Sequence, residues 1–529
     1  MASLTRRDLM QRGAVIAGGL ATARLLAACG GSDATSTSAG DLRDLAGALR
    51  GKLILPDSPG YGSARLVWNS RFDGRPLAIA QVADARDVQT AVDFARGHGL
   101  RLVPRSGAHS FAGYSSGDGS LVVDLSRMTG VQVDSPAERA TIEAGATVLP
   151  TYRALWPHRR AISGGTCPTV GITGLMAGGG LGFLSRRYGL TCDGLLEVEI
   201  VTADGKHRRA SEHANQDLYW ATRGGGGGNF GVITAMTFEL VPVDMPFTNA
   251  EYAFPWKAAE RVLAAWQDWL PTAPRDTSCL LEVLTQSPQD GASPTIGIEV
   301  VHAGSAAATR RIVADLLGAV GTPPLHSDVT QGPFVDVEND VYCKGLRPKE
   351  CALAGKSPAG EFPRAAFYAK SNIAQGPWPS DGLSALVEGM RRRQEDRTLT
   401  PRDFSSAHTI GKLIIEPADG AVNALPADAT AFVHRDNLFD IQYQARWHHG
   451  APQEVVAANM AWTNELYEQT KRYRSGFAYQ DYLDPELEDW EHAYYGANLA
   501  RLRSVKSKYD PDDFFRFAQS IPPTGAHYA

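Results

Sequence analysis

The feature that most constrains this chain is a glycine-rich stretch that surrounds a single cysteine. Residues 164–182 read Gly-Gly-Thr-Cys-Pro-Thr-Val-Gly-Ile-Thr-Gly-Leu-Met-Ala-Gly-Gly-Gly-Leu-Gly. A backbone with so few side chains can approach a flat or anionic ligand closely. The stretch is neither a Rossmann dinucleotide fingerprint, since it lacks the strand-GxGxxG-helix pattern, nor a P-loop, since no Gly-Lys-Ser/Thr follows. We therefore expect two turns that wrap a large cofactor.

Two further loops share this character. Residues 104–110 (Pro-Arg-Ser-Gly-Ala-His-Ser) follow an expected strand, and their amide groups can cradle a pyrophosphate. Taken alone, this loop is more typical of a turn with a surface histidine. Residues 223–234 contain five consecutive glycines, which cost backbone entropy on folding. Because a strand pattern follows the glycines directly, we expect them to wrap a cofactor rather than form a flexible linker.

These three segments, in this order and spacing, resemble the FAD-binding domain of the berberine bridge enzyme-like oxidases, within the vanillyl-alcohol oxidase/p-cresol methylhydroxylase superfamily. The end of the chain strengthens the resemblance. Residues 479–484 (Tyr-Gln-Asp-Tyr-Leu-Asp) resemble the family's Tyr-x-Asn-Tyr-x-Asp, and residues 494–498 (Tyr-Tyr-Gly-Ala-Asn) match its Tyr-Tyr-Gly-x-Asn. Residues 506–511 and 519–522 also fit. The resemblance spans about residues 68–523, essentially the whole mature chain.

The resemblance implies an α+β fold with a two-part FAD-binding domain. We expect this domain at residues 67–244. An α/β substrate domain with a large antiparallel sheet is expected at 245–470, and a C-terminal segment, 471–529, is expected to return to the FAD domain and complete it.

The resemblance also implies which residues hold FAD. The family's loop histidine, here His109, bonds the flavin 8α-methyl group, and its turn cysteine, here Cys167, bonds C6, so we expect bicovalent FAD. A thiolate is the competent nucleophile for the second bond. The other residues expected to contact FAD are Arg105, Ser106, Gly107, Ala108, Ser110, Gly165, Thr166, Thr169, Val170, Gly171, Thr173, Gly174, Gly178, Gly179, Gly182, Gly231, Val232, Tyr495 and Asn498.

The reaction that the resemblance implies is removal of a hydride from an alcohol-type C–H bond of a sugar, oligosaccharide or polycyclic secondary metabolite. Val170 stands at the family's oxygen gatekeeper position, where valine accompanies O2 as acceptor and H2O2 as product. Tyr482 is expected to be the base, with Tyr479 and Tyr188 nearby. A phenol has an unperturbed pKa near 10, so its neighbours must activate it. Gln442 stands where berberine bridge enzyme has a catalytic glutamate; it cannot act as a base and is expected to orient substrate or a phenol.

Three positions depart from the family pattern. Ala108 replaces a glycine, a change that the loop is expected to tolerate. Leu175 replaces a histidine that bonds the cofactor, which is expected to lower the flavin's reduction potential. Asp481 replaces an asparagine next to Tyr482, where a carboxylate either opposes a phenolate or accepts the phenol's proton.

Two alternatives stay open on the sequence. One is a dehydrogenase of the same fold that passes electrons to a quinone or a protein, and the other is a lipoprotein that binds without turnover. No His, Cys or Asp cluster has metal-ligand spacing, and the adjacent His448 and His449 are expected at the surface, so no metal is expected. The net charge of −6 argues against a nucleic-acid binder. The oligomeric state is left open.

The first 29 residues are expected to be an export signal. Residues 5–10 (Thr-Arg-Arg-Asp-Leu-Met) look like a twin-arginine motif, and residues 26–29 (Leu-Ala-Ala-Cys) resemble a lipoprotein box. We therefore expect twin-arginine export to the periplasm or cell surface, with an anchor on lipidated Cys29 and a tether and N-terminal segment at 30–66. In such a compartment Cys343 and Cys351 could pair, within a segment, 331–360, that is expected to be irregular and exposed.

Apolar periodicity places the regular elements. The expected strands are 77–80, 102–104, 121–125, 296–302 and 438–447, and the expected helices are 84–97, 306–317 and 454–469. Asp84 is the expected N-cap of the first helix. Along the last strand, period two places Asp440, Gln442, Gln444 and Arg446 on one face.

Overall fold

The computed structural model of the chain describes residues 37–286, 293–396 and 409–526. The expected export signal and Cys29 lie outside these ranges and stay predictions. In the described ranges no helix combines the length and the apolar character that a membrane span requires.

The first sheet carries the loop at 104–110. Its strands run in the order β1-β2-β4-β3, with β2, β4 and β3 parallel and β1 antiparallel to β2. The elements are α1 (Ala39–Ala48), β1 (Lys52–Ile54), α2 (Tyr61–Ala64), β2 (Ala78–Gln81), α3 (Ala85–Gly97), β3 (Leu102–Arg105) and β4 (Leu121–Asp124). Asp84 caps α3 by accepting hydrogen bonds from the amides of Arg86 and Asp87. The expected strands, helix and N-cap of this region are confirmed.

The second sheet is antiparallel, in the order β5-β6-β10-β8-β9, and lies next to the glycine-rich turns. Its elements are β5 (Val131–Asp134), β6 (Arg139–Glu143), α4 (Val148–Leu155), α5 (Ile172–Gly178), α6 (Ser185–Tyr188), β8 (Leu195–Val201), β9 (His207–Ser211), α7 (Gln216–Thr222) and β10 (Val232–Glu239). A short pair, β7 (Arg160–Ala161) with β11 (Val241–Pro242), completes this part. The turns at 162–171 and 179–184 flank α5, and the five glycines join α7 to β10.

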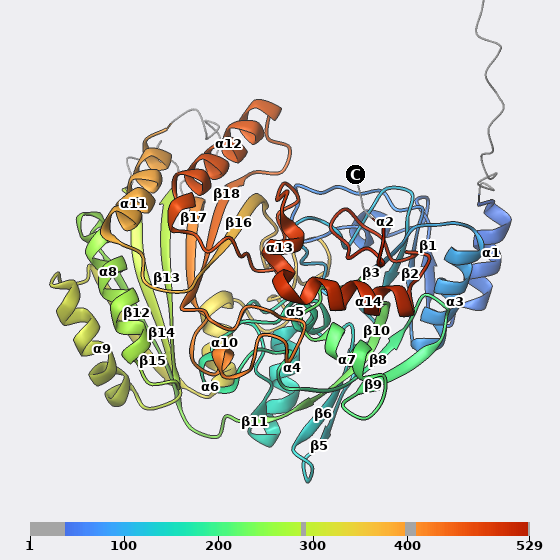
Figure 1. Ribbon diagram of the computed structural model, residues 1–529, viewed down its shortest axis with the longest axis horizontal. Coiled ribbons are helices and arrows are strands. Elements are labelled where there is room, and N and C mark those ends of the chain that lie inside the picture. Colours follow the sequence, from blue (N-terminus) through green and yellow to red (C-terminus); the bar gives the residue numbers. More distant parts are fainter. Residues whose placement is uncertain (1–36, 287–292, 397–408, 527–529) are drawn as a thin grey trace, which may run out of the picture. The chain divides into compact units, whose positions relative to one another are not determined.

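The third sheet is the expected large antiparallel one, in the order β15-β12-β14-β13-β17-β18-β16. Its strands are β12 (Phe247–Phe254), β13 (Thr277–Gln286), β14 (Thr295–His302), β15 (His326–Gly332), β16 (Ala366–Ala374), β17 (Thr409–Pro417) and β18 (Phe439–Trp447). Helices α8 (Ala259–Trp269), α9 (Ala306–Val320), α11 (Ser380–Glu395) and α12 (Gln453–Gln469) cover one face (Figure 1). Leu413, Ile415, Ile441 and Tyr443 are buried in the core beneath these helices. The alternate residues of β17 and β18 therefore face the other way.

The C-terminal segment returns to the first part of the chain, as expected. Helices α13 (Trp490–Tyr495) and α14 (Leu499–Tyr509), red in Figure 1, share one core with the first two sheets. Lys506 is fully buried; its Nζ donates to the carbonyls of Asn229 and Phe515 at 2.8 and 2.7 Å and pairs with Asp510. The tail thus closes over the end of the glycine run.

The prediction that residues 331–360 are irregular and exposed is wrong for their first part, whereas residues 344–360 contain no helix or strand. Helix α10 (Phe334–Cys343) lies in the first part, and Phe334 and Val337 are buried in the core of the FAD-binding part, inside the range expected for the substrate domain. The helical spacing of Phe334, Val337 and Val341 was visible in the sequence, but charged residues between them hid it. Cys343 and Cys351, whose pairing the sequence left open, form a disulfide with their Cα atoms 5.9 Å apart.

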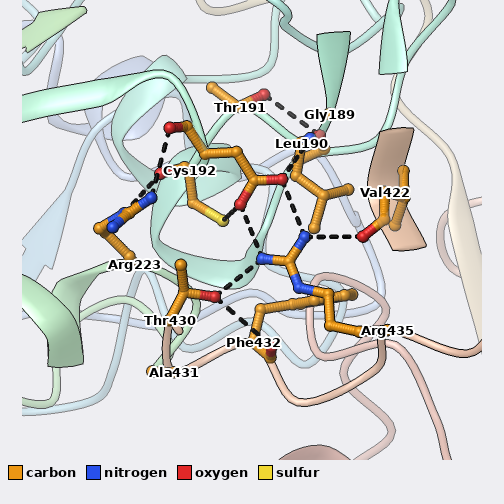
Figure 2. A network of polar contacts seen from close by, with 12 residues as sticks. Gly189, Leu190, Thr191, Cys192, Arg223, Val422, Thr430, Ala431, Phe432 and Arg435 are labelled. Carbon is orange, nitrogen blue, oxygen red and sulfur yellow. Dashed lines mark hydrogen bonds and ion pairs between the residues drawn. The ribbon is translucent and has the colours of Figure 1, made fainter. Parts of the chain in front are cut away.

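A buried ion pair joins the segment between β17 and β18 to the turn after α6 (Figure 2). The two terminal nitrogens of Arg435 contact the two carboxylate oxygens of Asp193 at 2.8 and 2.7 Å. Arg435 also donates to the Val422 carbonyl and the Thr430 hydroxyl, and Asp193 accepts from the Leu190 amide. Both side chains are almost fully buried, at 3% and 8% exposure. The pair therefore fixes the connection through which β17 leads into β18.

Replacing Asp193 with asparagine is expected to destabilise the protein because it leaves the Arg435 charge buried without a counter-charge. We expect the free energy of unfolding in urea to fall by about 3–5 kcal/mol. Asp381→Asn is the matched control, since Asp381 pairs with Arg472 in an exposed contact and should change stability by about 0–1 kcal/mol. Equal small effects of both substitutions would contradict a clamping role.

Candidate functional site

Two glycines allow two loop backbones to cross at the centre of the site. A Cβ atom on Gly107 would lie 2.2 Å from the Gly171 nitrogen, and one on Gly171 would lie 2.4 Å from the Gly107 nitrogen. Any side chain at either position would push the loops apart. The next residue, Ala108, has a φ of +62°, which glycine adopts more readily. The loop tolerates this alanine, as expected, with some backbone strain.

The crossing brings His109 and Cys167 together around one hydroxyl group. His109 Nε2 and Thr169 Oγ1 are hydrogen-bonded at 2.7 Å, and the Thr169 hydroxyl and amide also hydrogen-bond Cys167. The indole of Trp68 stacks on the His109 ring, with centroids 4.6 Å apart. With Nε2 engaged by Thr169, Nδ1 of His109 is left for a second contact.

Burial controls the protonation of both residues. It lowers the pKa of His109 to about 3, so its imidazole is neutral. It raises the pKa of Cys167 to about 11, although the hydrogen bonds from Thr169 oppose that shift. The site therefore holds a neutral imidazole and a thiol whose ionised form is stabilised mainly by Thr169.

A cavity of about 1170 Å³ runs along both loops and beneath the polar face of the large sheet. Most of the predicted site residues line it: Arg105, Ser106, Gly107, Ala108, His109, Ser110, Gly165, Thr166, Cys167, Val170, Gly171, Thr173, Gly174, Gly178, Gly231, Gln442, Tyr479, Tyr482 and Tyr495. The structure thus brings together residues from three glycine-rich loops, strand β18 and the C-terminal segment.

Six predicted residues do not line the cavity: Tyr188, Thr169, Gly179, Gly182, Val232 and Asn498. The prediction that Tyr188 lies in the site is wrong, because its hydroxyl donates to the Pro242 carbonyl on β11. Thr169 lies behind the lining, where it hydrogen-bonds His109 and Cys167, which both line the cavity. Asn498 donates to the carbonyls of Ala427, Thr430 and Ala431, so it supports the segment before β18. Gly179, Gly182 and Val232 lie in the turns and strand behind the lining.

Glu416 is the most important residue that sequence reasoning missed. It lies on β17, where Lys412, Ile414 and Glu416 alternate toward the cavity, and its carboxylate accepts a hydrogen bond from the Tyr482 hydroxyl at 2.5 Å. No motif marks it. The available signal was the isolated acid at the end of an otherwise apolar strand pattern, Leu-Ile-Ile-Glu at 413–416.

The Tyr482–Glu416 pair is buried, and the Tyr482 hydroxyl donates a short hydrogen bond to the Glu416 carboxylate. Burial raises the pKa of Glu416, and burial together with the neighbouring Glu416 charge raises that of Tyr482 well above 10. The expected activation of Tyr482 therefore does not come from a lowered pKa. Instead, a carboxylate lies in hydrogen-bond contact, ready to take the phenol's proton.

Tyr479 lies edge-on to Tyr482 as expected, with ring centroids 5.0 Å apart, but its hydroxyl and Asp481 hold the glycine turn. The Tyr479 oxygen accepts hydrogen bonds from the Gly180 and Leu181 amides at 2.9 and 3.1 Å, and its hydroxyl donates to Asp481 at 2.7 Å. Burial raises the pKa of Asp481 to about 7. The expected contact of Asp481 with the Tyr482 phenol is not formed, because Glu416 occupies that place.

The cavity has the features that a dinucleotide cofactor requires. Ligand cavities for one drug-sized molecule measure roughly 300–1,000 Å³, so this one has room for more. Four lining residues carry buried polar atoms without a partner in the described part of the chain: the indole nitrogen of Trp68, Nε and one terminal nitrogen of Arg105, the Ser116 hydroxyl and the Gln480 amide. Such atoms usually pair with a ligand or water. By contrast, no group of His, Cys, Asp or Glu among the described residues is arranged to hold a metal ion.

Comparison with known proteins identifies the two parts of this site. Residues 76–211 match the model of an FAD binding domain, and residues 478–522 match the model named berberine and berberine like. The chain is 33% identical over 477 residues to the FAD-linked oxidoreductase YvdP of Bacillus subtilis, covering 90% of this chain and 99% of that protein.

Two oxidases are also similar. The aclacinomycin-N/aclacinomycin-A oxidase of Streptomyces galilaeus is 30% identical over 566 residues, with 98% of this chain and 99% of that protein covered. The structure of xylooligosaccharide oxidase from Myceliophthora thermophila, in complex with xylobiose, superposes with a TM-score of 0.79 at 26% identity, covering 92% of this chain and 99% of that one.

The chain therefore belongs to the berberine bridge enzyme-like family of FAD-linked oxidases. It is an enzyme, an FAD-linked oxidoreductase of the vanillyl-alcohol oxidase fold type, as the sequence indicated.

Proposed function

We propose that this protein is an oxidase that binds FAD covalently through His109 and Cys167, oxidises an alcohol group of a small molecule and passes the electrons to O2, giving H2O2. The observation that carries the proposal is the meeting of His109 and Cys167 at one hydroxyl, on a cavity that the Tyr482–Glu416 pair also lines. Similar proteins are named for the oxidation of aclacinomycins and xylooligosaccharides, which supports an alcohol of a sugar or a glycosylated secondary metabolite.

The two attachment residues are prepared by the chain itself. Thr169 holds Nε2 of His109, which leaves Nδ1 as the free nucleophile, and its hydroxyl hydrogen bond stabilises the thiolate of Cys167. Trp68 stacks on the imidazole and fixes the plane of the ring. FAD, when bound, supplies the acceptor for the hydride and the route of the electrons to oxygen.

The Tyr482–Glu416 pair removes the hydroxyl proton of the substrate. A free phenolate is disfavoured because burial raises the pKa of Tyr482. Tyr482 therefore accepts the substrate's proton at Oη as it passes its own proton to the Glu416 carboxylate, 2.5 Å away. Gln442, which pairs with Ile414 across the β17–β18 ladder, lines the same wall and orients the substrate hydroxyl.

Val170 supports oxygen as the electron acceptor. It lies in the turn between Cys167 and Gly171 and lines the cavity, where its small branched side chain leaves more room than a leucine. An enzyme that instead uses a quinone or a protein acceptor would be reduced by substrate without oxygen and then reoxidised only slowly by air.

Removing either member of the pair should slow substrate oxidation. Because the ionised Glu416 is the active form and burial raises its pKa, the rate of flavin reduction should fall as pH drops through that raised pKa and stay high above it. Glu416→Gln and Tyr482→Phe should each lower this rate about 10²- to 10⁴-fold, and Glu416→Gln should abolish the acidic limb. Anaerobic stopped-flow reduction, with peroxide release measured in air, checks both. A Glu416→Gln enzyme with the wild-type pH profile would contradict the assignment.

Replacing Thr169 should impair covalent attachment rather than folding. Thr169→Val keeps the shape of the side chain but removes the hydroxyl that contacts His109 and Cys167, so we expect a larger fraction of flavin released by acid precipitation. Thr169→Ser restores the hydroxyl and should restore attachment. Full attachment in the valine variant would show that the hydroxyl has no role.

A further inference from the structure

Arg446 presents a guanidinium group to the cavity without a carboxylate partner. It lies on β18, on the same face as Gln442 and Gln444, and its Nε donates to the Gln444 side-chain oxygen at 2.5 Å. No Asp or Glu of the described chain lies within ion-pair distance of it. Glu282, the acid whose charge acts on Arg446 from farther away, is paired with Lys412 at 2.5 Å. Both terminal nitrogens of Arg446 are therefore left for another group.

An unpaired cation in a cavity calls for an anion. Burial lowers the pKa of Arg446, and the more distant Glu282 only partly offsets that effect. A charge removed from water is costly until it is paired. Another arginine of the cavity, the fully buried Arg105, already has its counter-charge in Asp124 at 2.8 Å. Arg446 thus stands out on the wall where the substrate must lie.

The cofactor does not supply this anion. Arg446 lies within electrostatic range of Cys167 and Tyr342, and Tyr342 accepts a hydrogen bond from the Thr166 hydroxyl. Cys167 is the residue proposed to hold the ring system of FAD, which is uncharged in its oxidised, substrate-binding form, and the permanent negative charges of FAD are on its pyrophosphate. The missing partner therefore belongs to the substrate.

We propose that the substrate carries a carboxylate, which the terminal nitrogens of Arg446 bind while its alcohol reacts at Tyr482 and Glu416. The planar fork of a guanidinium matches a carboxylate in a two-point contact. Gln442 and Arg446 are four residues apart on one strand, roughly 13 Å. That spacing fits a molecule of about two sugar rings with the acid at the end remote from the oxidised carbon, such as a disaccharide that ends in a uronic acid. This inference rests on the proposed function.

The test compares two disaccharides that differ in one group. Cellobiose and its counterpart with glucuronic acid at the non-reducing end are given to the flavin-loaded, full-length enzyme, and kcat/KM for anaerobic flavin reduction is measured. The acidic sugar should be preferred roughly tenfold or more. Arg446→Gln should remove this preference, so that the ratio of the two kcat/KM values falls to about one, and Arg446→Lys should restore part of it.

A matched control separates binding from a general loss of positive charge. Arg364 also lines the cavity, two residues before β16, but its Nε donates to the Val67 carbonyl and not to a residue of β18. Arg364→Gln should keep the preference. Because Arg446 also lowers the pKa of Cys167, the mass of each variant is measured. An Arg446→Gln enzyme that loses flavin at Cys167 but keeps its preference for the acid would overturn the proposal.

The remaining outcomes are also decisive. Equal kcat/KM for both sugars in the wild type would overturn the inference while leaving the oxidase assignment in place. If neither sugar reduces the flavin, perturbation of the flavin absorbance by benzoate and by benzamide replaces the kinetic comparison. Tighter benzoate binding that Arg446→Gln removes supports the carboxylate site, and equal or absent binding refutes it. Failure of every alcohol to reduce the flavin would count against the proposed function alone.

Discussion

The loop after β3 and the turn before α5 cross where Gly107 faces Gly171, with no room for a side chain on either residue. Their contact sets the distance between the two segments, and from that distance follow the hydrogen bond of His109 to Thr169 and the position of Cys167 beside the same hydroxyl. The fold supports the crossing from both sides. The parallel strands of the first sheet deliver one loop, and α5 with the antiparallel second sheet holds the other.

The large antiparallel sheet supplies the chemistry on the opposite wall. Alternation along β17 and β18 buries one set of side chains beneath the helices and turns Glu416, Gln442 and Arg446 toward the cavity. Removal from water then shapes what these groups do. It raises the pKa values of Glu416 and Tyr482, whose side chains are hydrogen-bonded to each other. Among the residues that the structure describes, Arg446 has no carboxylate partner on this wall of the cavity. The same wall that carries Tyr482's partner Glu416 can therefore also select a substrate by its charge.

Sequence reasoning succeeded where the constraint is local. Glycine-rich loops, the N-cap Asp84 and the period-two face of β18 depend on neighbouring residues and were predicted with correct positions. Reasoning from sequence failed where distant segments decide the outcome. Glu416 becomes a site residue only because the C-terminal segment brings Tyr482 to β17. The position of Tyr188 was predicted wrongly because its hydrogen-bond partner, Pro242, lies on a separate pair of strands. Helix α10 was missed because its burial depends on two distant segments: Phe334 packs against Tyr152 of α4 in the FAD-binding part and against Phe247 of β12 in the large sheet.

Peptide mapping of the protein produced with ample riboflavin tests the central claim most directly. The account predicts that after digestion the peptides containing His109 and Cys167 carry flavin, as one cross-linked species, and that His109→Ala and Cys167→Ala variants each retain the single remaining bond. Flavin that separates completely from the denatured wild-type chain, or that is found on any other residue, would contradict it.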